Sequence, residues 1–177
     1  MLGFDASLTS SGFAYKDSEG EYHTGRVKTE RLKGPERLSF IRECFIDVIG
    51  KASKVAPVEL IIYEGYAMSR NANNAFTIGE LGGVLSLAAW EMGIDVLLVP
   101  PSNLKQFTTG KGNADKDRMI ECVASSWGYS VPQNDEADAF ALLKLGEYYV
   151  ANVNRQRSSI KQSAVQKCRL IPGRSGG

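Results

Sequence analysis

The sequence has 177 residues, a length typical of one domain, and its 43% hydrophobic and 23% charged residues exclude an intrinsically disordered chain. No apolar run reaches the roughly 18 residues that a membrane span needs, and the amino terminus lacks the pattern of a signal peptide. Three widely spaced cysteines without a Cys-x-x-Cys pair argue against a zinc site or a disulfide framework, and they favour a reducing compartment.

Charge is unevenly distributed along the chain, although the net charge is only +1. Six basic residues follow the last acidic residue, Glu147, which leaves fifteen basic against twenty acidic residues up to that point. An acidic body favours cation binding, whereas the basic end is either a polyanion-binding segment or a solvated terminus. We therefore expect one domain over residues 1–150 and a basic, partly disordered tail over residues 151–177. The basic residues of this tail are Arg155, Arg157, Lys161, Lys167, Arg169 and Arg174.

Three short strands are expected at the amino end of the chain, over residues 2–7, 11–15 and 22–28. Turn-forming residues at 17–20 separate the second strand from the third. Consecutive strands joined in this way predict an antiparallel meander.

A helix and a buried strand follow the meander. Gly34 and Pro35 open the helix, whose apolar residues recur at helical spacing up to Ala52. The apolar run 58–63 ends at Glu64 and predicts a parallel strand that is buried on both faces.

The second half of the chain alternates helices with one more buried strand. In chain order we expect a glycine-bearing helix over 75–92, a strand over 94–99, a short helix over 103–107, and helices over 114–127 and 135–150. Because right-handed crossovers return each later strand parallel to the first, this order predicts an α/β fold. The mixed sheet would have five strands, three antiparallel followed by parallel ones, with helices flanking it.

Four carboxylates are candidates for a metal site. Asp5 and Glu64 end two expected strands, and ligands of an open α/β sheet bind beyond the carboxyl ends of its strands. Asp135 and Asp138 are three residues apart, so a helix places both on one face. Like charges this close need a cation, and oxygen ligands select Mg²⁺ or Mn²⁺. Two such ions about 4 Å apart are suited to phosphodiester cleavage.

Each carboxylate taken alone also has a simpler interpretation. Asp5 is a turn former, Glu64 could be a solvated strand end, and Asp135 with Asp138 suits the first turn of a helix. Their joint occurrence at strand ends and at a helix start favours the metal site.

Six segments carry a resemblance to a known family: Leu2–Ser7 with Thr9–Ala14, Tyr63–Met68, Asn71–Gly83, Val99–Lys105, Gly110–Lys116 and Asn134–Ala139. In their order and spacing they resemble the RuvC family of Holliday-junction resolvases, within the ribonuclease H-like superfamily, and especially its phage and phage-like members. The resemblance covers residues 1–150. It implies a ribonuclease H-like fold and a metal-dependent, structure-selective endonuclease that nicks branched DNA, above all four-way junctions, as a homodimer.

The resemblance also implies roles for six residues. They are Asp5, Glu64, Asp135 and Asp138 as metal-binding acids, and Lys105 and Lys116 as basic groups near the scissile phosphate. We expect two Mg²⁺ ions, with Mn²⁺ as a substitute: Asp5 is shared, Glu64 holds one ion, and Asp135 with Asp138 holds the other. Cleavage would leave a 5′-phosphate and a 3′-hydroxyl. Without the resemblance, both lysines are better explained as solvated helix surface.

Other positions have less definite roles. The helix from Asn71 to Gly83 resembles the family's dimer and junction contact, although it could simply pack on its own sheet. Tyr66 lies within one residue of the position where bacterial members carry an aromatic that helps open the junction, and its role stays open. His23 lies far from the acids and is expected to be structural.

Two other classes of function fit the sequence less well. An actin-like or sugar-kinase-like ATP-binding protein needs two such domains, and Gly110-Lys111 lacks the rest of a phosphate loop. A non-catalytic junction binder would lack one of the acids, and none is missing. A nuclease with broader specificity for forks, flaps or three-way junctions stays open. The expected compartment is the cytoplasm of a bacterium or of a phage-infected host.

Overall fold

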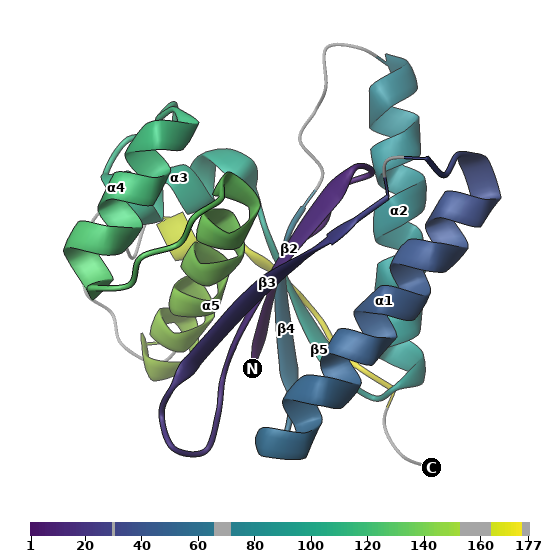
Figure 1. Cartoon of the computed structure of the whole chain (residues 1–177), viewed down its shortest axis with the longest axis horizontal. Helices are drawn as coiled ribbons and strands as arrows, with labels where there is room; N and C mark the ends of the chain where they lie inside the picture. The colour runs from purple at the N-terminus through teal and green to yellow at the C-terminus, as the bar shows by residue number, and fades with distance from the viewer. Residues whose placement is uncertain (30, 66–71, 153–163, 175–177) are drawn as a thin grey trace.

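A computed structural model of the chain describes residues 1–29, 31–65, 72–152 and 164–174 (Figure 1). Within these residues the centre of the molecule is a six-stranded sheet in the order β3-β2-β1-β4-β5-β6. The strands are β1 (Leu2–Asp5), β2 (Ser10–Lys16), β3 (Tyr22–Lys28), β4 (Leu60–Glu64), β5 (Asp95–Val99) and β6 (Arg169–Ile171). The helices are α1 (Gly34–Val55), α2 (Ala72–Glu91), α3 (Pro101–Thr109), α4 (Lys116–Trp127) and α5 (Asn134–Asn152).

The strand directions agree with the sequence prediction. β1 pairs antiparallel with β2, and β2 pairs antiparallel with β3. β1, β4 and β5 run parallel, as right-handed crossovers require. The α/β class and the mixed sheet are therefore confirmed.

The prediction of five strands was wrong, because the basic tail supplies a sixth. β6 pairs antiparallel with β5 at the edge of the sheet. Just before it, Ala164 and Val165 are buried in the core, and Asn103 Nδ2 of α3 donates a hydrogen bond of 2.7 Å to the Ala164 carbonyl. A strand of three residues carries no hydrophobic alternation from which sequence analysis could have predicted it.

Helices cover both faces of the sheet (Figure 1). α1 and α2 pack on one face, over a core that includes Leu2, Phe4, Ile61 and Tyr63. α3, α4 and α5 lie on the other face, over a core that includes Ile62. Successive side chains along a strand point to opposite faces of the sheet, so alternate residues of each strand face different sets of helices.

α5 approaches the sheet so closely that glycine is needed beneath it. A Cβ atom on Gly3 would lie 2.2 Å from the Ala139 carbonyl oxygen, and one on Gly12 would lie 1.9 Å from the Asp135 carbonyl oxygen. Gly3 and Gly12 lie on the same face of the sheet as Asp5, since Gly3 is two residues before Asp5 on β1 and Gly12 is paired with Asp5. The carboxylate of Asp5 is thereby on the α5 face of the sheet.

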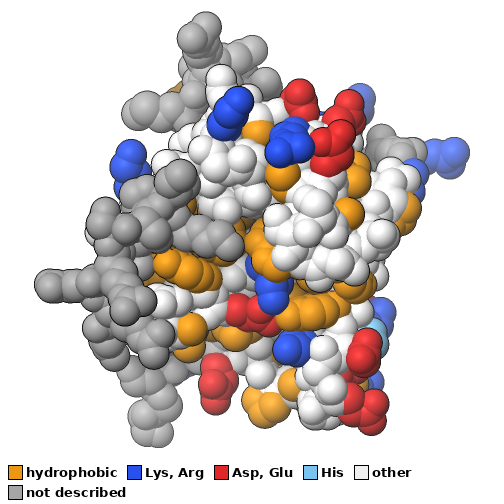
Figure 2. Space-filling model, turned by 90° about the vertical axis from the view of Figure 1, so that its left-hand side faces the viewer, with side chains coloured by type: hydrophobic (Ala, Val, Ile, Leu, Met, Phe, Trp, Pro, Cys, Tyr) orange, Lys and Arg blue, Asp and Glu red, His pale blue; other side chains and the backbone are white. Residues whose placement is uncertain are grey.

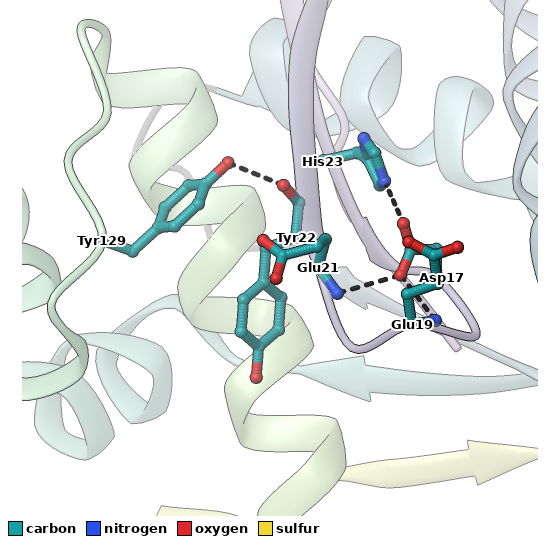
Figure 3. Close-up of polar contacts among 6 residues, drawn as sticks. All are labelled: Asp17, Glu19, Glu21, Tyr22, His23 and Tyr129. Atoms are coloured by element: carbon teal, nitrogen blue, oxygen red, sulfur yellow. Dashed lines mark hydrogen bonds and ion pairs between the residues drawn. The ribbon is translucent and has the colours of Figure 1, made fainter.

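The hairpin between β2 and β3 holds the single histidine of the chain, away from this face (Figure 3). His23 Nε2 lies 2.7 Å from Asp17 Oδ2, and Asp17 Oδ1 accepts backbone N–H groups of Glu19 and Glu21 at 2.9 Å. The bond to His23 is the largest cause that lowers the pKa of Asp17. These contacts fix the turn, which agrees with the structural role expected for His23.

A candidate acidic metal centre

The two strand-end carboxylates lie on neighbouring strands. Asp5 is the last residue of β1 and Glu64 the last of β4, and the two strands pair in parallel with Gly3 opposite Ile62. Glu64 comes two residues after Ile62 and lies on the same face of β4, so it faces α5 as Asp5 does. Both carboxylates therefore leave the sheet at the same edge and on the same face.

The first turns of α5 bring two more carboxylates to this edge. Asp135 and Asp138 contribute to raising the pKa of Asp5, and Asp138 also raises that of Glu64. Burial is the first cause in each case, and like charge is the next. All four predicted acids thus share one electrostatic neighbourhood, although Asp5 and Asp138 are far apart in the sequence.

The acids differ in how strongly their protons are held. The pKa of Glu64 is raised to about 7, chiefly by burial, with Asp138 adding to it and Lys105 opposing it. Burial also raises the pKa of Asp138 to about 6, against the opposing charges of Lys116 and Lys105. The pKa of Asp5 is raised well above its usual range. Glu64 is thus not the freely solvated strand end that its simpler interpretation supposed.

Both predicted lysines act on this cluster from the helices that flank it. Lys105 lies half-buried on α3, and Lys116 is the exposed first residue of α4. Asp115 Oδ1 accepts the Arg118 N–H at 2.8 Å and so starts α4 at residue 116. Lys105 and Lys116 both lower the pKa of Asp138, while Lys116 also lowers that of Asp5. The structure therefore brings all six candidate residues together.

The cluster has a polar contact that sequence analysis missed. Ser10, the first residue of β2, donates a hydrogen bond of 2.5 Å from its Oγ to Asp135 Oδ2. Next to Asp135 along the chain, the buried Asn134 Oδ1 has no hydrogen-bond partner within the described residues. The sequence carries no signal for Ser10, because only the register of β2 on β1 shows that it lies on the same face as Gly12, the residue paired with Asp5.

The donor set fits a hard divalent cation. It consists of carboxylate oxygens, which Mg²⁺ and Mn²⁺ prefer, and burial with like charge disfavours their ionisation unless a cation is present. Among the described residues, no three His, Cys, Asp or Glu side chains already form a ready cage for an ion. Binding of an ion would therefore need these carboxylates to close around it.

A cleft of about 310 Å³ opens beside Glu64. Its walls come from residues 6–8 after β1, from Glu64 and Gly65, and from Ile78 and Leu81 of α2. Tyr66 and Asn71 lie outside the described residues. Among the described residues, no helix combines the length and apolar character that crossing a bilayer requires.

Fold and site together define a class of protein. A mixed sheet with antiparallel β1–β3, parallel β1, β4 and β5, and carboxylates gathered at its carboxyl edge against a helix is the arrangement of ribonuclease H-like metal-dependent nucleases. The family model described as "Crossover junction endodeoxyribonuclease RuvC" matches residues 1–143.

Known relatives and solved structures agree with this class. Crossover junction endodeoxyribonuclease RuvC of Brachyspira hyodysenteriae is 30% identical over 146 residues, covering 80% of this chain and 89% of the relative. The enzyme of Hydrogenovibrio crunogenus is 28% identical, covering 80% and 83%. Thermus thermophilus RuvC in complex with Holliday junction substrate matches with a TM-score of 0.66 and 25% identity, covering 83% of this chain and 92% of that one. The chain belongs to the RuvC family of crossover junction endodeoxyribonucleases.

Proposed function

We propose that this chain is a metal-dependent endonuclease that resolves four-way DNA junctions. The observation that carries the proposal is the shared electrostatic neighbourhood of its four acids and two lysines at one edge of the sheet. The solved RuvC bound to a Holliday junction substrate supports junction DNA as the substrate of this fold.

Asp5, Glu64, Asp135 and Asp138 would hold two Mg²⁺ ions, or Mn²⁺ in their place. Asp5 has a central position, since the charges of all three other acids act on it, and it would be shared by the two ions. Glu64 would hold one ion, and Asp135 with Asp138 the other. When bound, such ions activate a water nucleophile and offset charge on the reacting phosphate and leaving oxygen.

The lysines would bind the scissile phosphate. Lys116 is exposed and Lys105 is half-buried, and both act electrostatically on Asp138. An ammonium group at this position can hold a phosphate oxygen and oppose the negative charge that develops during cleavage. The products would be a 5′-phosphate and a 3′-hydroxyl.

A two-fold junction calls for two active sites, and α2 offers a surface for a homodimer. Phe76 and Leu87 are 74% and 53% exposed, and Trp90 is 43% exposed. Apart from the helix's own backbone, no atom of the described residues lies within 4 Å of a Cβ position on Gly79 or Gly83. At 100° per residue these five residues lie on one stripe of the helix, which a second copy could cover.

The cellular compartment in which such a protein acts follows from its DNA substrate. The DNA of a bacterium or of an infecting phage lies in the cytoplasm, which is where we propose that the chain acts. All three cysteines are free, as suits a reducing compartment.

Cleavage of four-way, three-way, forked and linear DNA by the full chain tests the proposal. We expect paired nicks in the four-way junction with Mg²⁺ or Mn²⁺, and no nicks in chelator. Ca²⁺ should support binding better than cutting, because its looser coordination positions water poorly. Asp5→Asn should reduce cutting at least 100-fold and keep junction binding, whereas Lys54→Met, at the end of α1, should cut normally.

Efficient cleavage in chelator would contradict the role of the metal. Junction binding without cutting by the wild-type chain in every metal would indicate a non-catalytic binder. Equal cutting of forks and three-way junctions would indicate the broader branched-DNA specificity. Mapping the product ends checks the predicted 5′-phosphate.

A further inference from the structure

Ser10 connects the start of β2 to the start of α5. Its Oγ donates to Asp135 Oδ2 at 2.5 Å, across 125 positions of the sequence. Both side chains are half-buried. A short hydrogen bond to an ionised carboxylate is stronger than one between neutral groups.

The backbone next to this bond is fixed as well. Gly12 lies two residues after Ser10 on the same face of β2, and a Cβ atom there would lie only 1.9 Å from the Asp135 carbonyl oxygen, so no side chain fits. On β3, Thr24 donates to Glu136 at 3.1 Å. The start of α5 is therefore held by β2 through its backbone and by β3 through the side chain of Glu136, while the hydroxyl of Ser10 acts on the Asp135 carboxylate itself.

Repulsion within the cluster makes that hydroxyl important. Asp135 raises the pKa of both Asp5 and Asp138, so the three carboxylates repel one another when ionised. A side chain free to rotate would turn away from its neighbours toward solvent. The bond to Ser10 opposes this rotation, and it occupies only part of the acceptor capacity of a carboxylate.

We propose that Ser10 is a positioning residue that holds the Asp135 carboxylate ready for metal binding. This inference rests on the proposed function, in which Asp135 is a metal ligand. Hydrogen-bond partners of metal ligands change metal affinity or activity by 10–100-fold when they are removed. A purely structural bond would instead change stability and leave metal affinity unaltered.

Threonine and valine at position 10 form a matched pair, because they have the same shape and differ by one hydroxyl. We expect Ser10→Thr to bind Mn²⁺ within about threefold of the wild type and Ser10→Val to bind it about 10–100-fold more weakly, measured by calorimetry on the full chain. The Mn²⁺ concentration for half-maximal junction cleavage should shift by the same factor. Thermal melting in chelator should be alike for the two variants, and Ser10→Ala replaces Ser10→Val if valine prevents folding.

A second comparison tests whether the effect passes through Asp135. In an Asp135→Asn background, Ser10→Val should cause no further loss of Mn²⁺ affinity. Equal Mn²⁺ affinity of Ser10→Thr and Ser10→Val, or the same added loss in the Asp135→Asn background, would overturn the proposal while leaving the function intact. A wild-type chain that binds no Mn²⁺ and cuts no junction would overturn the proposed function itself.

Discussion

The carboxyl group of Glu64 ends an apolar strand, and its environment makes ionisation costly. In the metal-free protein its pKa is about 7, chiefly through burial, against an ordinary value near 4.5. Between these pH values the folded protein keeps a proton that the unfolded chain has released. Stability therefore falls as the pH rises through this window, because the folded state binds more protons.

Glu64→Gln should remove this contribution to the pH dependence. At pH 8 in chelator we expect the variant to be more stable than the wild type by about 1–3 kcal/mol, and at pH 4.5 the two should be nearly equal. Urea denaturation at the two pH values measures the difference. A wild-type advantage at pH 8 in chelator would show that the buried carboxylate is not a source of instability.

Added metal should make the wild type more stable than Glu64→Gln at pH 8. Mg²⁺ or Mn²⁺ binds the ionised carboxylate and stabilises the folded wild type by mass action. Glu64→Gln lacks that ligand, so its melting temperature should rise less when the metal is added at pH 8.

At the scale of elements, the contact between α5 and β2 decides where Asp135 and Asp138 lie. A Cβ atom on Gly12 would meet the backbone of Asp135 at 1.9 Å, and backbone cannot move aside as a flexible side chain can. Gly12→Ala should therefore displace the start of α5, cost about 1–3 kcal/mol of stability and abolish most junction cleavage.

A matched control for this substitution is Gly50→Ala in α1. Outside the helix's own backbone, a Cβ atom on Gly50 would meet no atom of the described residues within 4 Å, so alanine should stabilise the helix by about 0.5–1 kcal/mol and leave cleavage unchanged. Urea denaturation and junction cleavage of both variants measure the two effects. Gly12→Ala that cuts at the wild-type rate would contradict the role assigned to this contact.

These elements also show which features a sequence reveals. Apolar runs and turn residues predicted β1 to β5 because each pattern is local, and the parallel order followed from crossovers. β6 depends on pairing with β5, a contact between distant segments, so its three residues carried no signal of their own. The acids were predicted from strand ends, whereas the bond between Ser10 and Asp135 needed the register of β2.

Helix boundaries show a similar limit. α2 begins at Ala72 instead of the expected residue 75, and α3 extends beyond 103–107 to Pro101–Thr109. α4 begins two residues later than expected, because Asp115 caps it with its side chain. Caps and first turns depend on single hydrogen bonds, which hydrophobic periodicity does not report.

On the scale of the whole molecule, the two sides of the sheet expose different sets of helices (Figure 1). The side that carries α3, α4 and α5 intersperses acidic and basic side chains with apolar ones (Figure 2). On the opposite side of the sheet, α2 exposes the stripe of Phe76, Gly79, Gly83, Leu87 and Trp90. Small residues between large apolar ones let a second helix approach closely, which suits a two-fold contact between copies.

Leu87→Asp tests the dimer that this stripe suggests. Burying an unpaired carboxylate in an apolar interface is costly, so the variant should sediment as a monomer at concentrations where the wild type is a dimer. It should also nick four-way junctions on one strand at a time, since the paired cuts need two active sites together. Val150→Asp on α5 is the matched control, because Val150 is 53% exposed, as is Leu87, yet lies on the opposite side of the sheet. If the Leu87→Asp variant remains a dimer and cuts both strands in concert, the dimer contact must lie on another surface.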